Sequence, residues 1–166
     1  MKKCVFAGSF DPFTVGHELI ARKCLELFDE AIVAVGINSE KKPTFSLDER
    51  VSFIKAVFSD EKRIAVKSFS GLLVDFMREN DVKFTVRGIR NEKDYAYESN
   101  MAKINKGLDE SVTTLFLQVD EKFASVSSTA VRRALEDGLP LDGLVPEKEI
   151  APLLSAFRPG RTQTNR

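Results

Sequence analysis

The chain has 166 residues, of which 43% are apolar and 30% charged, the profile of an ordinary folded protein rather than of a disordered or fibrous one. A domain of this size withdraws roughly 70% of its unfolded surface from water, so it needs no disulfide or metal to hold its core. Basic and acidic side chains number 25 each, which excludes the overall basic excess that attracts nucleic acid or an anionic membrane. Any anion that binds must therefore meet a local cluster of donors.

Cysteine and histidine are too few for a disulfide framework or an ordinary zinc site. Cys4, Cys24 and His17 are the complete set, and no Cys-x-x-Cys pair occurs, so we expect no metal held by protein side chains. No apolar run approaches the roughly 18 residues of a membrane span, and the first residues do not form a signal peptide. These features favour a cytoplasmic protein.

The first half of the chain alternates apolar runs with stretches of helical periodicity. In chain order the predicted elements are a strand over Cys4–Ala7, a helix from Val15 to its last apolar position Phe28, a strand over Ala31–Ile37, a helix from Ser46 to Phe58 and a strand over Ile64–Phe69. The second strand is nearly continuous apolar, as expected for a strand buried on both faces. Ser46-Leu47-Asp48-Glu49 is a capping box that begins the second helix.

The second half continues the alternation and ends in a polar tail. Its predicted elements are a helix over Leu72–Glu79, a short strand over Phe84–Val86, a helix from about Glu92 to Lys106, a strand over Thr113–Leu117, a helix from about Ser128 to Gly138 and a helix over Pro146–Phe157. We predict one α/β domain over residues 1–157, built on a five-stranded parallel sheet, and a disordered tail over 158–166. Such sheets bind ligands beyond the carboxyl ends of their strands.

The loop after the first predicted strand, Ser9–His17, suits phosphate. Thr14 can cap the next helix, Gly16 leaves its backbone open, and His17 lies in the first turn near the positive end of the helix dipole. Two common nucleotide-binding loops are absent, since neither Gly-x-Gly-x-x-Gly nor Gly-x-x-x-x-Gly-Lys-Ser/Thr occurs. The ordinary interpretation is a simple N-cap followed by a packing glycine and an exposed histidine.

Three more loops carry groups that suit an anion. They hold Lys41-Lys42, Arg87-Gly88-Ile89-Arg90 and Ser125-Val126-Ser127-Ser128-Thr129. Guanidinium groups bind phosphate oxygens bidentately, and free amides at a helix start favour an anion. Taken alone, the three loops are also compatible with a solvated lysine pair, a basic turn and a helix cap. Tyr95, Tyr97 and Glu98, taken alone, are packing residues and a solvated charge.

Taken together, these motifs resemble those of bacterial phosphopantetheine adenylyltransferases, in the same order, from about residue 3 to residue 155. The matching motifs are Ser9-Phe10-Asp11-Pro12 with Thr14-x-Gly16-His17, Lys41-Lys42-Pro43, Gly71-Leu72-Leu73-Val74-Asp75-Phe76, Arg87-Gly88-x-Arg90, Asp94-Tyr95-x-Tyr97-Glu98 and Ser127-Ser128. The family belongs to the nucleotidyltransferases with a Thr/His-x-Gly-His signature. The resemblance implies a Rossmann-like domain with helices on both faces of the sheet.

The resemblance also implies a reaction: the transfer of AMP from ATP to 4′-phosphopantetheine, giving dephospho-CoA and pyrophosphate in the penultimate step of coenzyme A synthesis. ATP is then the co-substrate with Mg²⁺, which the nucleotide's own oxygens and water would largely hold. Family members form hexamers, so we expect a homohexamer, with no nucleic acid or membrane as partner.

Roles for individual residues follow from the same resemblance. His17 would be the catalytic residue, stabilising the transition state at the α-phosphate. Phosphopantetheine is expected at Ser9, Lys41, Arg87 and, through its backbone, Leu73. ATP is expected at Ser9, Phe10, His17, Gly88, Ile89, Arg90, Glu98, Phe123, Ala124, Ser125, Val126, Ser127, Ser128 and Thr129. Because the attacking group is already a phosphate anion, such a site needs alignment and charge neutralisation more than a strong base.

Two other functions stay open from the sequence. Residues 126–132 also resemble a motif of the nicotinate or nicotinamide mononucleotide adenylyltransferases, although Thr14 stands where that group usually has His. The second alternative is a non-catalytic module that binds a nucleotide or CoA on the same scaffold. The chain departs from the phosphopantetheine family at Ala7, where many members have proline, and at Phe123-Ala124-Ser125, a segment that often has an aromatic residue beside the serines.

Overall fold

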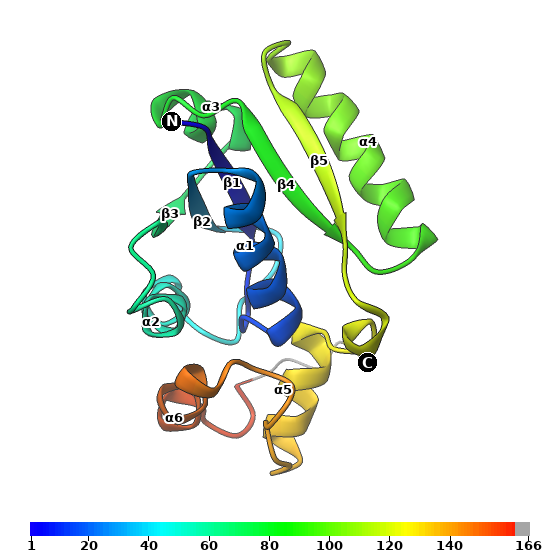
Figure 1. Cartoon of the computed structure of the whole chain (residues 1–166). Helices are drawn as coiled ribbons and strands as arrows, with labels where there is room; N and C mark the ends of the chain where they lie inside the picture. Colours follow the sequence, from blue (N-terminus) through cyan, green and yellow to red (C-terminus); the bar gives the residue numbers. More distant parts are fainter. Residues whose placement is uncertain (162–166) are drawn as a thin grey trace.

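A computed structural model of the chain describes residues 1–161 and contains one five-stranded sheet (Figure 1). The strands are β1 (Lys3–Gly8), β2 (Glu30–Gly36), β3 (Ile64–Phe69), β4 (Phe84–Ile89) and β5 (Thr113–Gln118). Their order is β3-β2-β1-β4-β5, and every neighbouring pair is parallel. Strands β2 and β3 lie on one side of β1, and β4 and β5 lie on the other. The order in which strands are added therefore reverses between β1 and β4, and open sheets of this kind bind ligands at such a point.

Six α-helices and one short 3₁₀ turn connect and follow these strands within the described residues. They are α1 (Val15–Leu27), α2 (Leu47–Val57), α3 (Leu73–Glu79), α4 (Glu92–Leu108), η1 (Glu121–Phe123), α5 (Ser128–Glu136) and α6 (Glu147–Ala156). The predicted α/β class and parallel sheet are confirmed. Most predicted boundaries lie within two residues of those observed, and the exception is β4.

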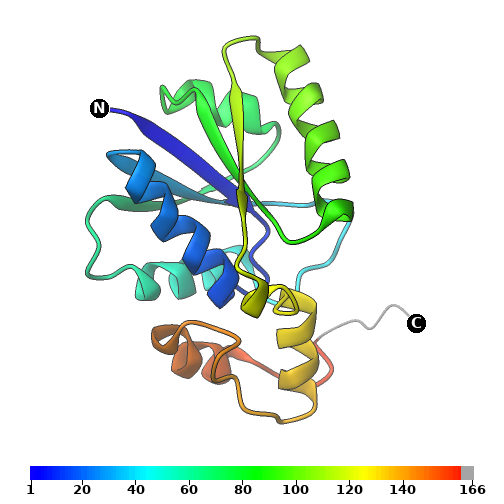
Figure 2. The same cartoon turned by 45° about the vertical axis from the view of Figure 1, so that its right-hand side comes forward.

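Both faces of the sheet are covered, because successive apolar side chains of the central strand point to opposite faces. Cys4 and Phe6 of β1 pack with α1 and α2 in one core cluster, whereas Val5 and Ala7 pack with α3 in another. Helix α4 runs beside β4 and β5, next to α3 (Figure 2). The central residues of β2 are all buried, as its apolar run predicts.

The fourth strand is three residues longer than predicted. Arg87 and Gly88 have the composition of a loop, but both continue the ladder with β5, opposite Phe116 and Leu117. Gly88 also fits the packing there, since a Cβ would make a tight contact, 3.2 Å from the side chain of Ile20 on α1. The glycine therefore lets a helix approach the strand, in addition to leaving space toward a ligand.

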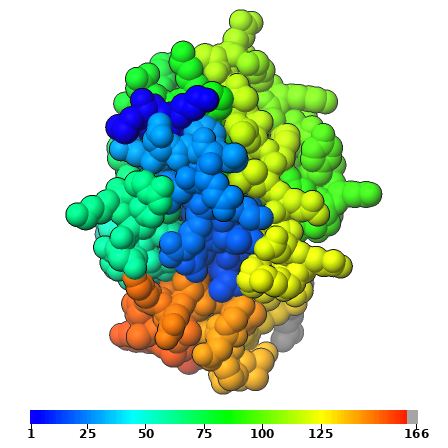
Figure 3. All heavy atoms as spheres, viewed as in Figure 1, coloured from blue at the N-terminus to red at the C-terminus, as the bar shows by residue number. Residues whose placement is uncertain are grey.

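Helices α5 and α6 lie below the carboxyl ends of the strands (Figure 1), and this part of the chain forms the lower end of the molecule in Figure 3. They form a third apolar cluster with Phe45, which precedes the N-cap of α2, and with Phe53 in the middle of that helix. Of the predicted tail, residues 158–161 are described and 162–166 lie outside the described residues. Arg161 bonds to the carboxylate of Glu49 on α2. Among the described residues, no helix is both long and apolar enough to cross a bilayer.

Candidate active site

A cavity of about 830 Å³ opens at the carboxyl ends of β1, β2 and β4. Its walls come from the loop after β1, the first turn of α1, the loop after β2, the end of β4, the start of α4 and the start of α5. Twelve of the predicted site residues line it: Ser9, Phe10, His17, Lys41, Arg87, Gly88, Arg90, Glu98, Val126, Ser127, Ser128 and Thr129. Segments up to 120 residues apart in the chain thus meet around one space.

The cavity is basic although the whole chain is neutral. Seven basic side chains line it, against four acidic ones. The basic group is Lys41, Lys42, Arg50, Arg87, Arg90, Arg132 and Arg133, and the acidic group is Asp11, Glu40, Asp94 and Glu98. A concave, partly desolvated surface focuses this excess of positive charge, so the cavity suits a polyanion such as a triphosphate.

His17 is held by the N-terminal cap of α1. The backbone N–H of Thr14 donates to His17 Nδ1 at 3.0 Å, and the N–H of His17 returns a bond to the Thr14 hydroxyl at 3.3 Å. The pair is a capping box in which histidine stands where glutamate or glutamine is usual. Since Nδ1 accepts a hydrogen bond, the proton of the neutral ring lies on Nε2, the nitrogen left for a ligand.

The surroundings of His17 keep it uncharged. Three phenylalanine rings pack around the imidazole, those of Phe6, Phe10 and Phe13. Desolvation by burial, together with the positive charges of Arg90 and Arg87, lowers the pKa of His17 to about 3. At neutral pH the lowered pKa leaves the ring uncharged, with an N–H donor at the cavity wall.

This protonation state can be tested directly, because His17 is the only histidine in the chain. In protein without a histidine tag, the ¹⁵N and ¹H chemical shifts of the ring are expected to be those of the Nε2–H tautomer. These shifts should stay constant from pH 8 to pH 5. A titration near pH 6.5 would show that the ring is more solvated, and more basic, than the cavity wall implies.

Arg87 and Glu98 form a bidentate ion pair at one wall of the cavity. Arg87 Nε and Nη2 each donate to a Glu98 carboxylate oxygen at 2.7 Å, and Nη1 donates to the carbonyl of Ala7. Glu98 is thus not a solvated charge on α4, which removes that alternative interpretation. Within residues 1–161, three of the five guanidinium N–H groups are used, so two remain for a phosphate.

Arg90 is fixed in a similar way by the start of α4. Its backbone N–H and its Nε both donate to Asp94 at 3.0 Å. Burial by itself would raise the pKa of Asp94, but the hydrogen bonds and charge of Arg90 hold that pKa below its ordinary value. The remaining guanidinium nitrogens of Arg90, on the same wall as Arg87, are available to an anion.

The hydroxyls at the start of α5 have partners within the protein. Ser127 caps the helix by accepting the N–H of Ala130 at 3.1 Å, and Ser128 donates to the carbonyl of Pro12 at 2.7 Å. Thr129 accepts a bond from Arg132 at 3.1 Å. The amides of this helix start, rather than spare hydroxyls, are therefore what the segment offers most directly to an anion.

Five predicted residues do not line the cavity: Leu73, Ile89, Phe123, Ala124 and Ser125. Leu73 begins α3 and packs its side chain against the second core cluster. Ile89 ends β4, and Phe123 belongs to η1 with its ring against the first core cluster. Their assignment to ligands stays a prediction.

Arg50 lines the cavity and is only 4% exposed, but it is not among the site residues predicted from the sequence. A signal for it exists in the sequence. Arg50 stands three, four and seven residues before Phe53, Ile54 and Val57, the buried residues of α2, so a charged residue occupies the apolar face of an amphipathic helix. Such a position indicates a buried charge with specific partners.

Residues 1–161 contain no group of three His, Cys, Asp or Glu side chains arranged to hold a metal ion. Two acidic side chains of the cavity, Asp94 and Glu98, form ion pairs with Arg90 and Arg87. A cation at this site would thus depend mostly on ligands from the substrate and from water.

Comparison with known proteins identifies the family. Residues 5–134 match the cytidylyltransferase-like family model. A phosphopantetheine adenylyltransferase of Clostridium novyi (strain NT) is 40% identical over 93% of this chain and 96% of the relative. The protein of the same name from Flavobacterium johnsoniae is 40% identical over 89% and 96%, and one from Clostridium botulinum (strain Langeland) is 43% identical over 90% and 92%. Nothing in these comparisons favours the pyridine mononucleotide alternative, and the chain belongs to the phosphopantetheine adenylyltransferase family.

Proposed function

We propose that this protein transfers AMP from ATP to 4′-phosphopantetheine, forming dephospho-CoA and pyrophosphate. The observation that carries the proposal is the basic cavity, in which an uncharged His17 and the paired arginines 87 and 90 face one space at the carboxyl ends of the strands. The names of relatives that match about nine-tenths of the chain supply the acceptor.

The reaction needs alignment and charge neutralisation. The acceptor phosphate oxygen attacks the α-phosphorus of ATP, a P–O bond forms, and the bond to pyrophosphate breaks with its electron pair leaving on pyrophosphate. His17 Nε2–H donates to an oxygen whose negative charge grows in the transition state, and Arg90 neutralises the phosphates. Arg87, Ser9 and Lys41 hold the acceptor. No residue is required to remove a proton from the nucleophile.

Magnesium enters this proposal as part of the substrate, MgATP. When bound, it supplies charge neutralisation to the phosphate oxygens and to the leaving pyrophosphate. The amides at the start of α5 and the basic side chains of the cavity would hold the nucleotide, which supplies most of the ion's ligands together with water. We also propose that the reaction takes place in the cytoplasm, which the absence of a disulfide framework among the two cysteines of the sequence favours.

Pyrophosphate release measured with one acceptor at a time tests the proposed function. The purified protein is given MgATP with phosphopantetheine, with nicotinate mononucleotide or with nicotinamide mononucleotide. Release with phosphopantetheine alone supports the proposal. Release only with a mononucleotide would establish the alternative transferase, and tight ATP binding without any release would indicate the non-catalytic module.

We further propose that the protein forms a homohexamer. Helix α4 supports an association surface, because none of its 17 residues is buried and four large apolar ones are about half exposed or more. These are Tyr95, Tyr97, Ile104 and Leu108. The edge strand β5 lies beside them. Sedimentation velocity is expected to give about six times the 18.6 kDa chain mass, and a monomeric mass would contradict it.

A further inference from the structure

We propose that Arg50 and Asp11 are positioning residues that fix the loop after β1 and the loop after β2 relative to each other, and thereby set the place of the phosphate acceptor. This inference rests on the proposed function. Neither residue has to touch a substrate for it to hold.

The guanidinium of Arg50 joins three main-chain segments. Its Nη1 donates to the carbonyl of Ser9 at 2.6 Å and to that of Gly36 at 3.2 Å, and its Nε donates to that of Phe45 at 3.1 Å. Ser9 directly follows β1, Gly36 is the last residue of β2, and Phe45 directly precedes the cap of α2. One buried side chain thus holds two strand ends and the approach to a helix.

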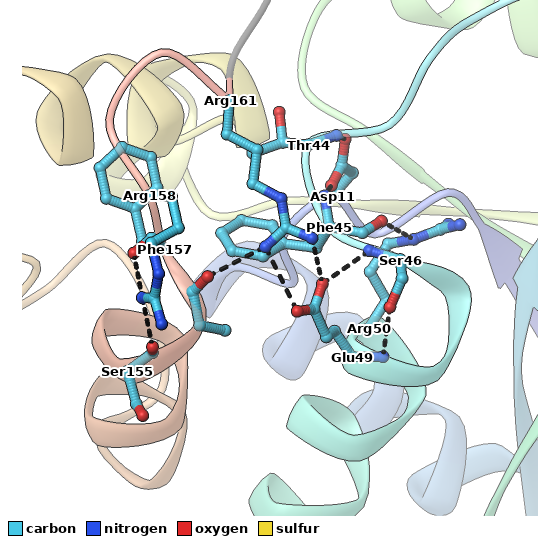
Figure 4. A network of polar contacts seen from close by, with 11 residues as sticks. Asp11, Thr44, Phe45, Ser46, Glu49, Arg50, Ser155, Phe157, Arg158 and Arg161 are labelled. Atoms are coloured by element: carbon cyan, nitrogen blue, oxygen red, sulfur yellow. Dashed lines mark hydrogen bonds and ion pairs between the residues drawn. The ribbon is translucent and has the colours of Figure 1, made fainter.

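Asp11, in the loop after β1, also bonds to the end of the loop after β2. Its carboxylate accepts the backbone N–H of Thr44 at 2.8 Å and that of Phe45 at 2.9 Å (Figure 4). Arg50 reaches the carbonyl side of the same segment, at Phe45 (Figure 4). A carboxylate on the amides and a guanidinium on the carbonyl form complementary charge-assisted bonds, which are stronger than neutral ones.

These anchors flank the loop that carries Lys41. Residues 37–43 run from Gly36, which Arg50 holds, to Thr44, which Asp11 holds. Both anchors lead back to the segment Ser9–Asp11. Ser9 and Lys41, two of the proposed acceptor contacts, therefore take their separation from this pair of side chains.

A role in stability alone does not account for the arrangement. A buried charge is costly, and an apolar side chain of similar size usually fills such a position on α2 at least as well. What the guanidinium adds is a fixed geometry among three carbonyls, which a flexible ammonium group cannot reproduce. The carbonyls belong to the cavity's own loops, so that geometry is transmitted to the acceptor site.

The test compares Arg50→Lys with Arg63→Lys. Arg63 is also an arginine bonded to a neighbour, Glu61, but it is exposed and lies before β3 at the other end of the strand. For Arg50→Lys, kcat/KM for phosphopantetheine is expected to fall about 10- to 100-fold, because small misplacements of reacting groups cost that much. The Kd for ATP is expected to stay within about threefold, and Arg63→Lys should match the wild type in both.

A second variant, Asp11→Asn, tests the same inference if Arg50→Lys does not fold. Asp11→Asn leaves the guanidinium in place but replaces one acceptor oxygen with a donor, and it should reproduce the loss on the acceptor side. All assays are run below the unfolding midpoint of each variant. Wild-type kcat/KM in a variant with a lowered midpoint would show a merely structural role and overturn the inference. An equal loss of ATP and acceptor binding would overturn it too.

The proposed function fails separately from this inference. If the wild type releases no pyrophosphate with phosphopantetheine, the function is refuted before any variant is compared. If the wild type is active and both variants equal it, only the positioning role is refuted.

Discussion

The His17→Ala enzyme is expected to bind ATP within a few-fold of the wild type while its kcat falls about 100-fold or more. In the proposed mechanism Nε2–H donates to charge that develops during the transfer, so its removal would affect the transition state more than the bound substrates. Steady-state assays of pyrophosphate release give kcat, and equilibrium titration gives the Kd of ATP. Unchanged turnover would refute the assigned role.

Glutamine at the same position distinguishes a donor from an acid or base. In His17→Gln the amide oxygen can accept the Thr14 N–H as Nδ1 does, and the amide NH₂ can replace the neutral Nε2–H. The kcat of this variant is expected to be at least about tenfold higher than that of His17→Ala. The glutamine variant should also recover stability, because alanine loses the half of the capping box in which the Thr14 N–H donates to the side chain of residue 17. A folded glutamine variant as inactive as alanine would indicate that a titrating imidazole is needed.

The sequence predicts helices and strands better than it predicts which side chains bond to each other in the folded chain. The alternation of apolar runs and helical stretches is enough to locate every strand, because each buried strand has its own short apolar segment. The end of β4 escaped prediction since Arg87 and Gly88 are polar and flexible in composition. Only the ladder to β5 and the side chain of Ile20 show why they continue the strand.

The site shows the same division. The position of His17 in a first helical turn follows from Thr14-x-Gly16-His17, but its protonation state depends on rings and arginines brought in from other segments. Likewise, Arg87 and Glu98 are 11 residues apart, and nothing local predicts that they pair. The place of Arg50 on the apolar face of α2 indicates that it is buried, but its partners are backbone carbonyls, which residue types do not identify.

The second large effect is expected at Glu149, in the first turn of α6. The side chain is completely buried, and neither carboxyl oxygen has a hydrogen-bond partner in the part of the chain that the structure describes. The backbone N–H of Phe13 faces the carboxyl without completing a bond of normal geometry, and the nearby carboxylate of Glu18 on α1 opposes a second negative charge. Burial, the main cause, raises the pKa of Glu149 to about 9.

The sign of the pH dependence follows from where the proton is. Between pH 4.5, the ordinary value, and about 9, the folded protein keeps the Glu149 proton and the unfolded chain loses it. Stability therefore falls as pH rises through this range, by up to about 1.4 kcal/mol per pH unit. His17 acts in the opposite direction, since its lowered pKa costs stability as pH falls from 6.5 toward 3.

Glu149→Gln removes this linkage and is expected to gain stability relative to the wild type as pH rises from 5 to 8. Denaturant unfolding at each pH gives the two free energies, and their difference should grow by about 4 kcal/mol between pH 5 and pH 8. Glu147→Gln, an exposed change in the same turn, should show no such trend. Any constant offset from altered packing is irrelevant, because only the slope with pH reports the buried proton. A flat difference would mean that the carboxyl is ionised in the folded protein, and that water or a partner reaches it between α1 and α6.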